Sequence, residues 1–157
     1  ISDFNFIDQK NNKFELIKLK GKIHVANFIF TSCGNICPIM TNNMGKVEDE
    51  FKNDDDVTLL SFSVTPWIDS PEVLNFYKKE YTQNSNNWYF LTGEESTVKR
   101  VIKDGFKIGD YEDIIFHSEK FALVDKKGMI RAYYNGMKTE DMKKLKKDIN
   151  SLLKQNS

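Results

Sequence analysis

Two segments of the chain are mostly apolar and place apolar residues on both faces of a strand. They run from Lys22 to Phe30 and from Val57 to Val64, and helical patterns follow both. A strand with apolar residues on both faces is typical of the buried middle of a parallel sheet. The pattern therefore predicts two buried, parallel strands.

Four stretches repeat apolar residues at the spacing of a helix with one buried face. The first runs from Pro38 to about Lys52, and the second starts at Ser70-Pro71-Glu72. The third runs from Glu94 to about Lys103, and the fourth starts near Thr139. The second start is the clearest, because it combines a capping serine, a proline and an acid in the first turn. The residues predicted to face inward are Met40, Met44, Val47, Phe51, Val73, Leu74, Tyr77, Tyr81, Val98, Val101, Ile102, Met142, Leu145, Ile149 and Leu152.

Short strands joined by polar turns predict one β-hairpin at the start of the chain and a second before the last helix. The first pairs Phe4–Ile7 with Lys13–Glu15, and the second pairs Lys120–Val124 with Met129–Tyr134. A further strand is expected at Trp88–Leu91. Alternating strands and helices followed by a hairpin predict an α/β fold with a mixed central sheet. We expect a thioredoxin-like three-layer sandwich with an N-terminal β-hairpin and helices on both faces.

Length and composition suit one globular domain. The 157 residues are 39% hydrophobic and 29% charged, and we expect a single domain over 1–157, with 1–20 as a hairpin extension and 154–157 as a frayed tail. Lys+Arg and Asp+Glu are balanced at 23 each, so no basic field attracts nucleic acid. No apolar run reaches the ~20 residues of a membrane helix. We therefore expect contact with a membrane only through an anchor absent from this chain.

The two cysteines, Cys33 and Cys37, follow the first buried strand where the chain enters a helix. Sheets of this class place their ligands at such strand ends, and the start of a helix favours thiolate over thiol. A disulfide here would close a very small loop and stabilise the fold little. At helical spacing the two Cβ atoms would be about 5–6 Å apart, which permits a disulfide after adjustment and suits a metal directly. An inert buried pair fits less well, because the cysteines flank Gly34-Asn35 at a predicted strand end and do not belong to a core stripe.

Four stretches of the chain resemble the Sco (SenC/PrrC) family. Phe30–Pro38 is similar to its F-T-x-C-x-x-x-C-P motif and Leu60–Pro66 to its I-S-V-D-P strand end. Asp69–Leu74 resembles its D-T-P-E-V-L helix start, and His117-Ser118, with the later Phe121–Asp125, resembles its H-S and L-I-D elements. One departure is Thr65, which stands where the family commonly has Asp and leaves partner identity and redox behaviour open.

The resemblance implies a copper ion, Cu(I) or Cu(II), held by Cys33, Cys37 and His117. It implies a metallochaperone that delivers copper to the CuA subunit of cytochrome c oxidase, or to another periplasmic copper protein, or that maintains the thiols of the CuA centre. It also implies an extracytoplasmic location on the periplasmic side of a bacterial membrane, with a tether in a removed N-terminal segment.

The residues themselves leave a second interpretation open. The same cysteine pair could serve a metal-independent thiol–disulfide oxidoreductase with disulfide-exchange partners, which would not need His117. In thioredoxins the loop before the closing hairpin faces the cysteines and carries a cis-proline, whereas here the imidazole of His117 takes that place. Two thiolates and an imidazole form a soft ligand set that holds copper in either oxidation state. We predict a structural role for His24 and a core role for Met40 and Met44.

Overall fold

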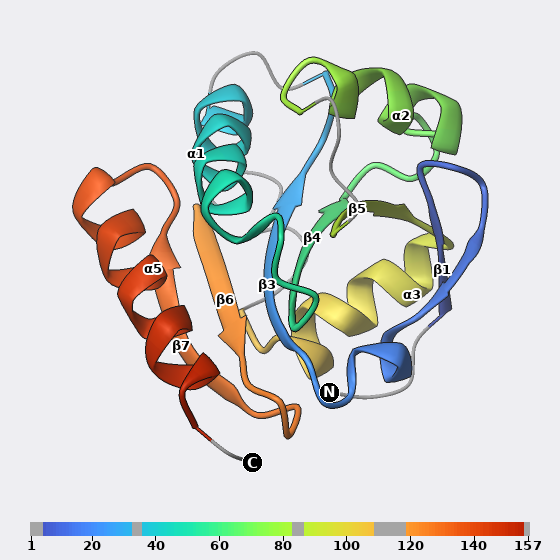
Figure 1. Cartoon of the computed structure of the whole chain (residues 1–157). Helices are drawn as coiled ribbons and strands as arrows, with labels where there is room; N and C mark the ends of the chain where they lie inside the picture. The colour runs from blue at the N-terminus through green and yellow to red at the C-terminus, as the bar shows by residue number, and fades with distance from the viewer. Residues whose placement is uncertain (1–4, 33–35, 83–86, 109–118, 156–157) are drawn as a thin grey trace.

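Among the residues that the computed structural model describes, 5–32, 36–82, 87–108 and 119–155, seven strands form one mixed sheet (Figure 1). The strand order is β2-β1-β5-β4-β3-β6-β7. The three central strands β5, β4 and β3 are parallel, and each outer strand is antiparallel to its neighbour. The strands are β1 (Asn5–Asp8), β2 (Lys13–Glu15), β3 (Ile23–Ile29), β4 (Val57–Ser63), β5 (Trp88–Thr92), β6 (Lys120–Val124) and β7 (Ile130–Asn135).

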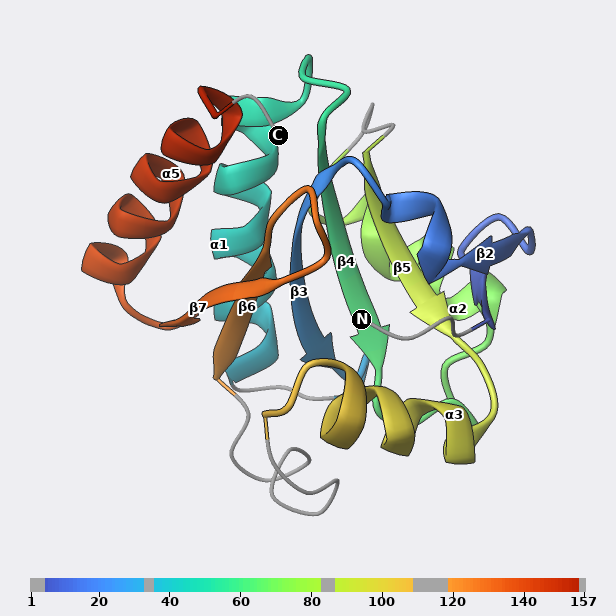
Figure 2. The same ribbon diagram turned by 90° about the horizontal axis from the view of Figure 1, so that it is seen from below.

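Helices cover both faces of the sheet (Figure 2), which confirms the predicted three-layer fold class. The cores on the two faces show that α1, α2 and α5 pack on one side and that α3 and the turn after it pack on the other. Because both faces are covered, β3 and β4 are buried at every position, as the apolar residues on both of their faces predicted. The helical elements are a short 3-10 helix (Leu16–Leu19), α1 (Ile36–Phe51), α2 (Pro71–Lys79), α3 (Glu95–Arg100), a π-helical turn (Val101–Gly105) and α5 (Thr139–Leu153).

The start of α2 is the one that the sequence predicts. The Ser70 side chain accepts a hydrogen bond from the Val73 backbone N–H, and Pro71 is the first helical residue. The start of α1 differs from the prediction, because the helix begins at Ile36 rather than at Pro38. A proline is tolerated at the third position as well, since the first four N–H groups of a helix have no partner within it.

Most of the predicted inward-facing residues are buried, and Val73 is the clear exception. Its side chain is 38% exposed on the outer side of α2, so the prediction for this residue was wrong. Tyr81 lies beyond the end of α2 and is half-buried. The residues predicted and found to be buried are Met40, Met44, Val47, Phe51, Leu74, Tyr77, Val98, Val101, Ile102, Met142, Leu145, Ile149 and Leu152.

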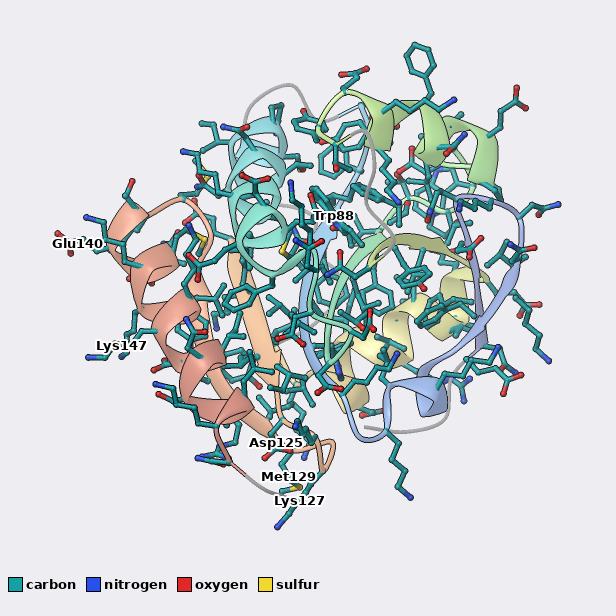
Figure 3. The ribbon with its side chains drawn as sticks, in the orientation of Figure 1. Trp88, Asp125, Lys127, Met129, Glu140 and Lys147 are labelled. Atoms are coloured by element: carbon teal, nitrogen blue, oxygen red, sulfur yellow. The ribbon has the colours of Figure 1, made fainter. Side chains whose placement is uncertain are left out.

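The labelled side chains of Figure 3 include both inner and outer positions. Trp88 is fully buried beneath α1, and its indole N–H donates to the Ser61 hydroxyl at 3.1 Å. Glu140 and Lys147 point outward from α5. No helix within the described ranges is both long and apolar enough to cross a membrane.

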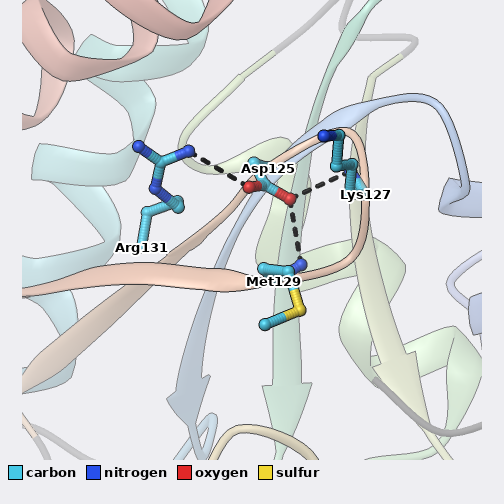
Figure 4. A network of polar contacts seen from close by, with 4 residues as sticks. All are labelled: Asp125, Lys127, Met129 and Arg131. Atoms are coloured by element: carbon cyan, nitrogen blue, oxygen red, sulfur yellow. Dashed lines mark hydrogen bonds and ion pairs between the residues drawn. The ribbon is translucent and has the colours of Figure 1, made fainter. Parts of the chain in front are cut away.

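The carboxylate of Asp125 accepts hydrogen bonds across the turn of the β6–β7 hairpin (Figure 4). Asp125 Oδ1 accepts from the backbone N–H groups of Lys127 and Met129, each at 2.9 Å, and Oδ2 accepts from Arg131 Nη1 at 3.2 Å. Burial by itself raises the pKa of the Asp125 carboxyl, but these hydrogen bonds outweigh it and the pKa is lowered. Gly128 supplies the positive φ of 80° that the turn requires.

Candidate metal centre

The topology directs the cysteine segment and the histidine segment to one edge of the sheet. At the carboxyl end of β3, Ile29 pairs with Ser63, the last residue of β4. Strand β6 is antiparallel to β3, so the chain starts β6 at Lys120 on this same edge. The segment that contains Cys33 follows β3, and the segment that contains His117 precedes β6. Cys33 and His117 themselves lie outside the described residues, whereas Cys37 lies within them.

Cys37 is the second residue of α1 and is only 2% exposed. It belongs to the same core cluster as Met40 and Met44, which are 1% and 0% exposed. Both methionines therefore lie in the core, as predicted. No acidic residue lies in the first turn of α1 to oppose a thiolate there.

Tyr77 of α2 belongs to the same core cluster as Cys37. The hydroxyl groups of Tyr77 and Thr41 are 3.1 Å apart and both are buried. Burial raises the pKa of Tyr77 far above its ordinary value, the Thr41 hydrogen bond opposes this rise, and the charge of Cys37 adds to it. The side of α1 that carries Cys37 is thus fixed against both the sheet and α2.

A fully buried carboxylate, Asp69, lies at the same edge of the sheet. It accepts hydrogen bonds from the backbone N–H of Thr31 at 3.3 Å and from the Thr31 hydroxyl. The Ser63 and Thr65 hydroxyl groups donate to its Oδ2 at 2.8 and 2.9 Å. Thr31 precedes Cys33 by two residues in the sequence. The carboxylate therefore connects the start of the cysteine segment to the end of β4.

A second set of hydrogen bonds connects α1 to the start of β6. Asn43 Nδ2 donates to the Gly136 carbonyl at 2.7 Å, and the Gly136 N–H donates to the Glu119 carbonyl at 2.6 Å. Asn135 Nδ2 also donates to the Glu119 carboxylate at 3.1 Å. Because Glu119 follows His117 by two residues, the helix that bears Cys37 and the end of the histidine segment share one anchoring point.

The other histidine, His24, is placed away from this edge. It is 3% exposed and lies near the amino end of β3, with its ring 6.0 Å from that of Phe106. Burial lowers its pKa to about 3. These observations agree with the structural role predicted for it. In the described part of the chain, no three His, Cys, Asp or Glu side chains are grouped as a metal site.

The role of Asp69 was not predicted from the sequence. A usable signal was present, because Ser61 and Ser63 interrupt the apolar pattern of β4. A polar side chain in a buried strand needs a hydrogen-bond partner. For Ser63 that partner is Asp69, whereas for Ser61 it is Asn27 of β3, whose Oδ1 accepts at 2.6 Å.

Comparison with known proteins gives a family match over almost the whole chain. The SCO1/SenC family model matches residues 1–154. The SCO1 protein homolog of Bacillus subtilis is 33% identical over 157 residues, which cover 96% of this chain and 81% of that protein.

Solved structures agree with this match. A SCO1/SenC family lipoprotein from Bacillus anthracis superposes with a TM-score of 0.86 at 33% identity, covering 98% of this chain and 95% of that one. BsSco, described as a cytochrome c oxidase assembly protein with a disulfide switch, gives a TM-score of 0.85 at 33% identity, covering 99% and 94%. Copper-bound yeast Sco1, at 24% identity, shares the fold with a TM-score of 0.79 and coverage of 99% and 93%.

Proposed function

The chain belongs to the SCO1/SenC family, and from this premise we propose that it binds one copper ion through Cys33, Cys37 and His117. The observation that carries the proposal is the arrangement of the sheet, in which the cysteine segment leaves β3 and the histidine segment reaches β6 at one edge. The donor set also fits the metal, because thiolate and imidazole are ligands that copper prefers over carboxylate and carbonyl oxygen.

Within this site Cys37 is the fixed ligand. Its backbone belongs to α1 and its side chain is buried, so it has little freedom to move. The positive end of the helix dipole stabilises its thiolate. Both thiols lose their protons when they bind the metal, so binding weakens as the pH falls.

We assign copper the role of cargo rather than of a resident cofactor. BsSco is described as a member of a family of cytochrome c oxidase assembly proteins, and we propose the same process for this chain, with the CuA subunit as the acceptor. The related Bacillus anthracis protein is a lipoprotein, which supports an extracytoplasmic protein tethered to a membrane. Transfer through shared ligands requires that the acceptor reach the edge of the sheet where β3 ends.

A second candidate function is thiol–disulfide exchange, which the disulfide switch described for BsSco favours. In that reaction the Cys33 and Cys37 thiols are oxidised to a disulfide, and a disulfide of the partner protein is reduced to two thiols. The two electrons and two protons pass from this chain to the partner. His117 has no necessary part in this reaction, which separates it from copper binding.

The chain has two histidines, and variants at these positions distinguish the two functions. We would measure bound copper in reduced wild type and in the Cys33→Ser, His117→Ala and His24→Leu variants. Wild type and His24→Leu should bind about one copper per chain, and the other two variants should lose most of it. Unchanged stoichiometry in His117→Ala would reject the three-ligand site. Full disulfide-reductase activity in that variant, with negligible copper binding in wild type, would favour the second function.

A further inference from the structure

Asp69 is a buried carboxylate that joins three elements of the fold. Within the described residues it accepts four hydrogen bonds, all from neutral groups. Two come from Thr31 after β3, and one each from Ser63 and Thr65 at the end of β4. Asp69 directly precedes Ser70, the capping residue of α2. Its own N–H donates to the Thr65 carbonyl at 2.9 Å. A buried charge is costly unless hydrogen bonds surround it, so this cluster fixes the relative positions of the three elements.

The cysteine segment is held at both of its ends. At its carboxyl end, Cys37 lies in the first turn of α1 with its side chain in the core. At its amino end, the backbone and the hydroxyl of Thr31 are bonded to the fully buried Asp69. Only residues 32–36 lie between these two fixed points.

We propose that Asp69 is a positioning residue, which acts through Thr31 to hold the Cys33 end of the segment at the correct separation from Cys37. For copper, this inference rests on the function proposed above. Ligands that are already in place bind a metal more tightly than ligands that must first be ordered. The Thr31–Asp69 bond therefore raises copper affinity without contact between Asp69 and the metal.

The cluster contains its own matched control. Thr31 and Thr65 both donate a hydroxyl hydrogen bond to Asp69; Thr31 is half-buried and Thr65 is buried, at 9% exposed. Only Thr31 leads directly into the cysteine segment, whereas Thr65 leads into the turn before α2. Loss of either hydroxyl removes one bond to the same carboxylate, but only one of the two losses releases the segment.

The experiment compares Thr31→Val, Thr31→Ser and Thr65→Val with wild type. Cu(I) affinity is measured by competition with a chromophoric chelator. The dithiol–disulfide equilibrium of Cys33 and Cys37 is measured without metal against dithiothreitol, in which the protein disulfide is reduced as dithiothreitol is oxidised. Loss of one hydrogen bond changes an equilibrium by about fivefold.

We expect Thr31→Val to bind Cu(I) about fivefold more weakly and to shift the thiol equilibrium by a similar factor. Thr31→Ser should restore both values, and Thr65→Val should match wild type in both. The proposal is overturned if Thr31→Val behaves as wild type, or if Thr65→Val has an equal effect, since Asp69 would then only stabilise the fold. Should wild type bind no copper, the proposed function fails, and the metal-free thiol equilibrium still decides the role of Asp69.

Discussion

His24 should make the protein lose stability in mildly acidic solution. The folded protein buries this imidazole at 3% exposure, and neither ring nitrogen has a hydrogen-bond partner among the described residues. Burial lowers its pKa from the ordinary value of 6.5 to about 3, and the charge of Asp125 opposes this shift only in part. The folded protein therefore favours the neutral form of the His24 imidazole.

The size of the effect follows from the two pKa values. Between them the unfolded chain carries a proton on His24 that the folded chain does not, so acid favours unfolding. Each pH unit below 6.5 lowers the free energy of unfolding by about 1.4 kcal/mol, which amounts to about 2 kcal/mol at pH 5. The loss stops growing near pH 3, where the folded form is protonated too. Stability gained at Asp125, whose pKa is lowered, is lost only below its ordinary value of 3.8, so Asp125 contributes little to the change between pH 7.5 and pH 5.

Urea unfolding of the reduced, metal-free protein, followed by tryptophan fluorescence, measures this difference. Wild type should be about 2 kcal/mol less stable at pH 5 than at pH 7.5. The His24→Leu variant should show little of this dependence and should gain stability at both pH values, because it removes two buried nitrogens that lack partners. Equal stability of wild type at the two pH values, or the same dependence in His24→Leu, would refute the reasoning.

Two further predictions concern the stability of the fold, and both use urea unfolding at neutral pH. Asp125→Ala should lower the free energy of unfolding by about 2–3 kcal/mol, because three hydrogen bonds to one carboxylate are lost. Arg131→Ala should lower it by less than about 1 kcal/mol, because the arginine of this ion pair is 46% exposed. Similar losses in both variants would contradict this account of the hairpin. Gly136→Ala should cost about 1–3 kcal/mol, since an added Cβ would lie 2.3 Å from the buried ring of Phe121. At Gly45 an added Cβ would have its nearest contact 3.7 Å away, so Gly45→Ala should instead stabilise α1 by about 0.5–1 kcal/mol. An equal loss of stability in both glycine variants would show that crowding at Phe121 does not cause the loss in Gly136→Ala.

Local patterns in the sequence were enough to predict most of the fold. The mostly apolar runs identified β3 and β4, because a strand that is buried on both faces carries apolar residues on both. Ser70 and Pro71 identified the start of α2 because capping depends on neighbouring residues only. The early start of α1 was less visible, since a proline is compatible with any position of the first turn.

Features that depend on distant residues could not be predicted in the same way. Val73 fits the inner stripe of α2 by spacing, yet its exposure depends on where the helix packs against the sheet. The bond from Thr31 to Asp69 joins residues that are 38 positions apart. For the metal site, the chemistry of two cysteines and a histidine could be inferred from residue type and family resemblance, while the burial of Cys37 required the three-dimensional structure.

X-ray absorption of the Cu(I)-loaded protein at the copper edge tests the three-ligand site most directly, because it identifies the atoms bound to the metal. Two sulfur neighbours and one imidazole should be found in wild type and in His24→Leu, and the imidazole signal should vanish in His117→Ala. A copper environment without sulfur, or an imidazole signal that persists in His117→Ala, would contradict the site proposed for this chain.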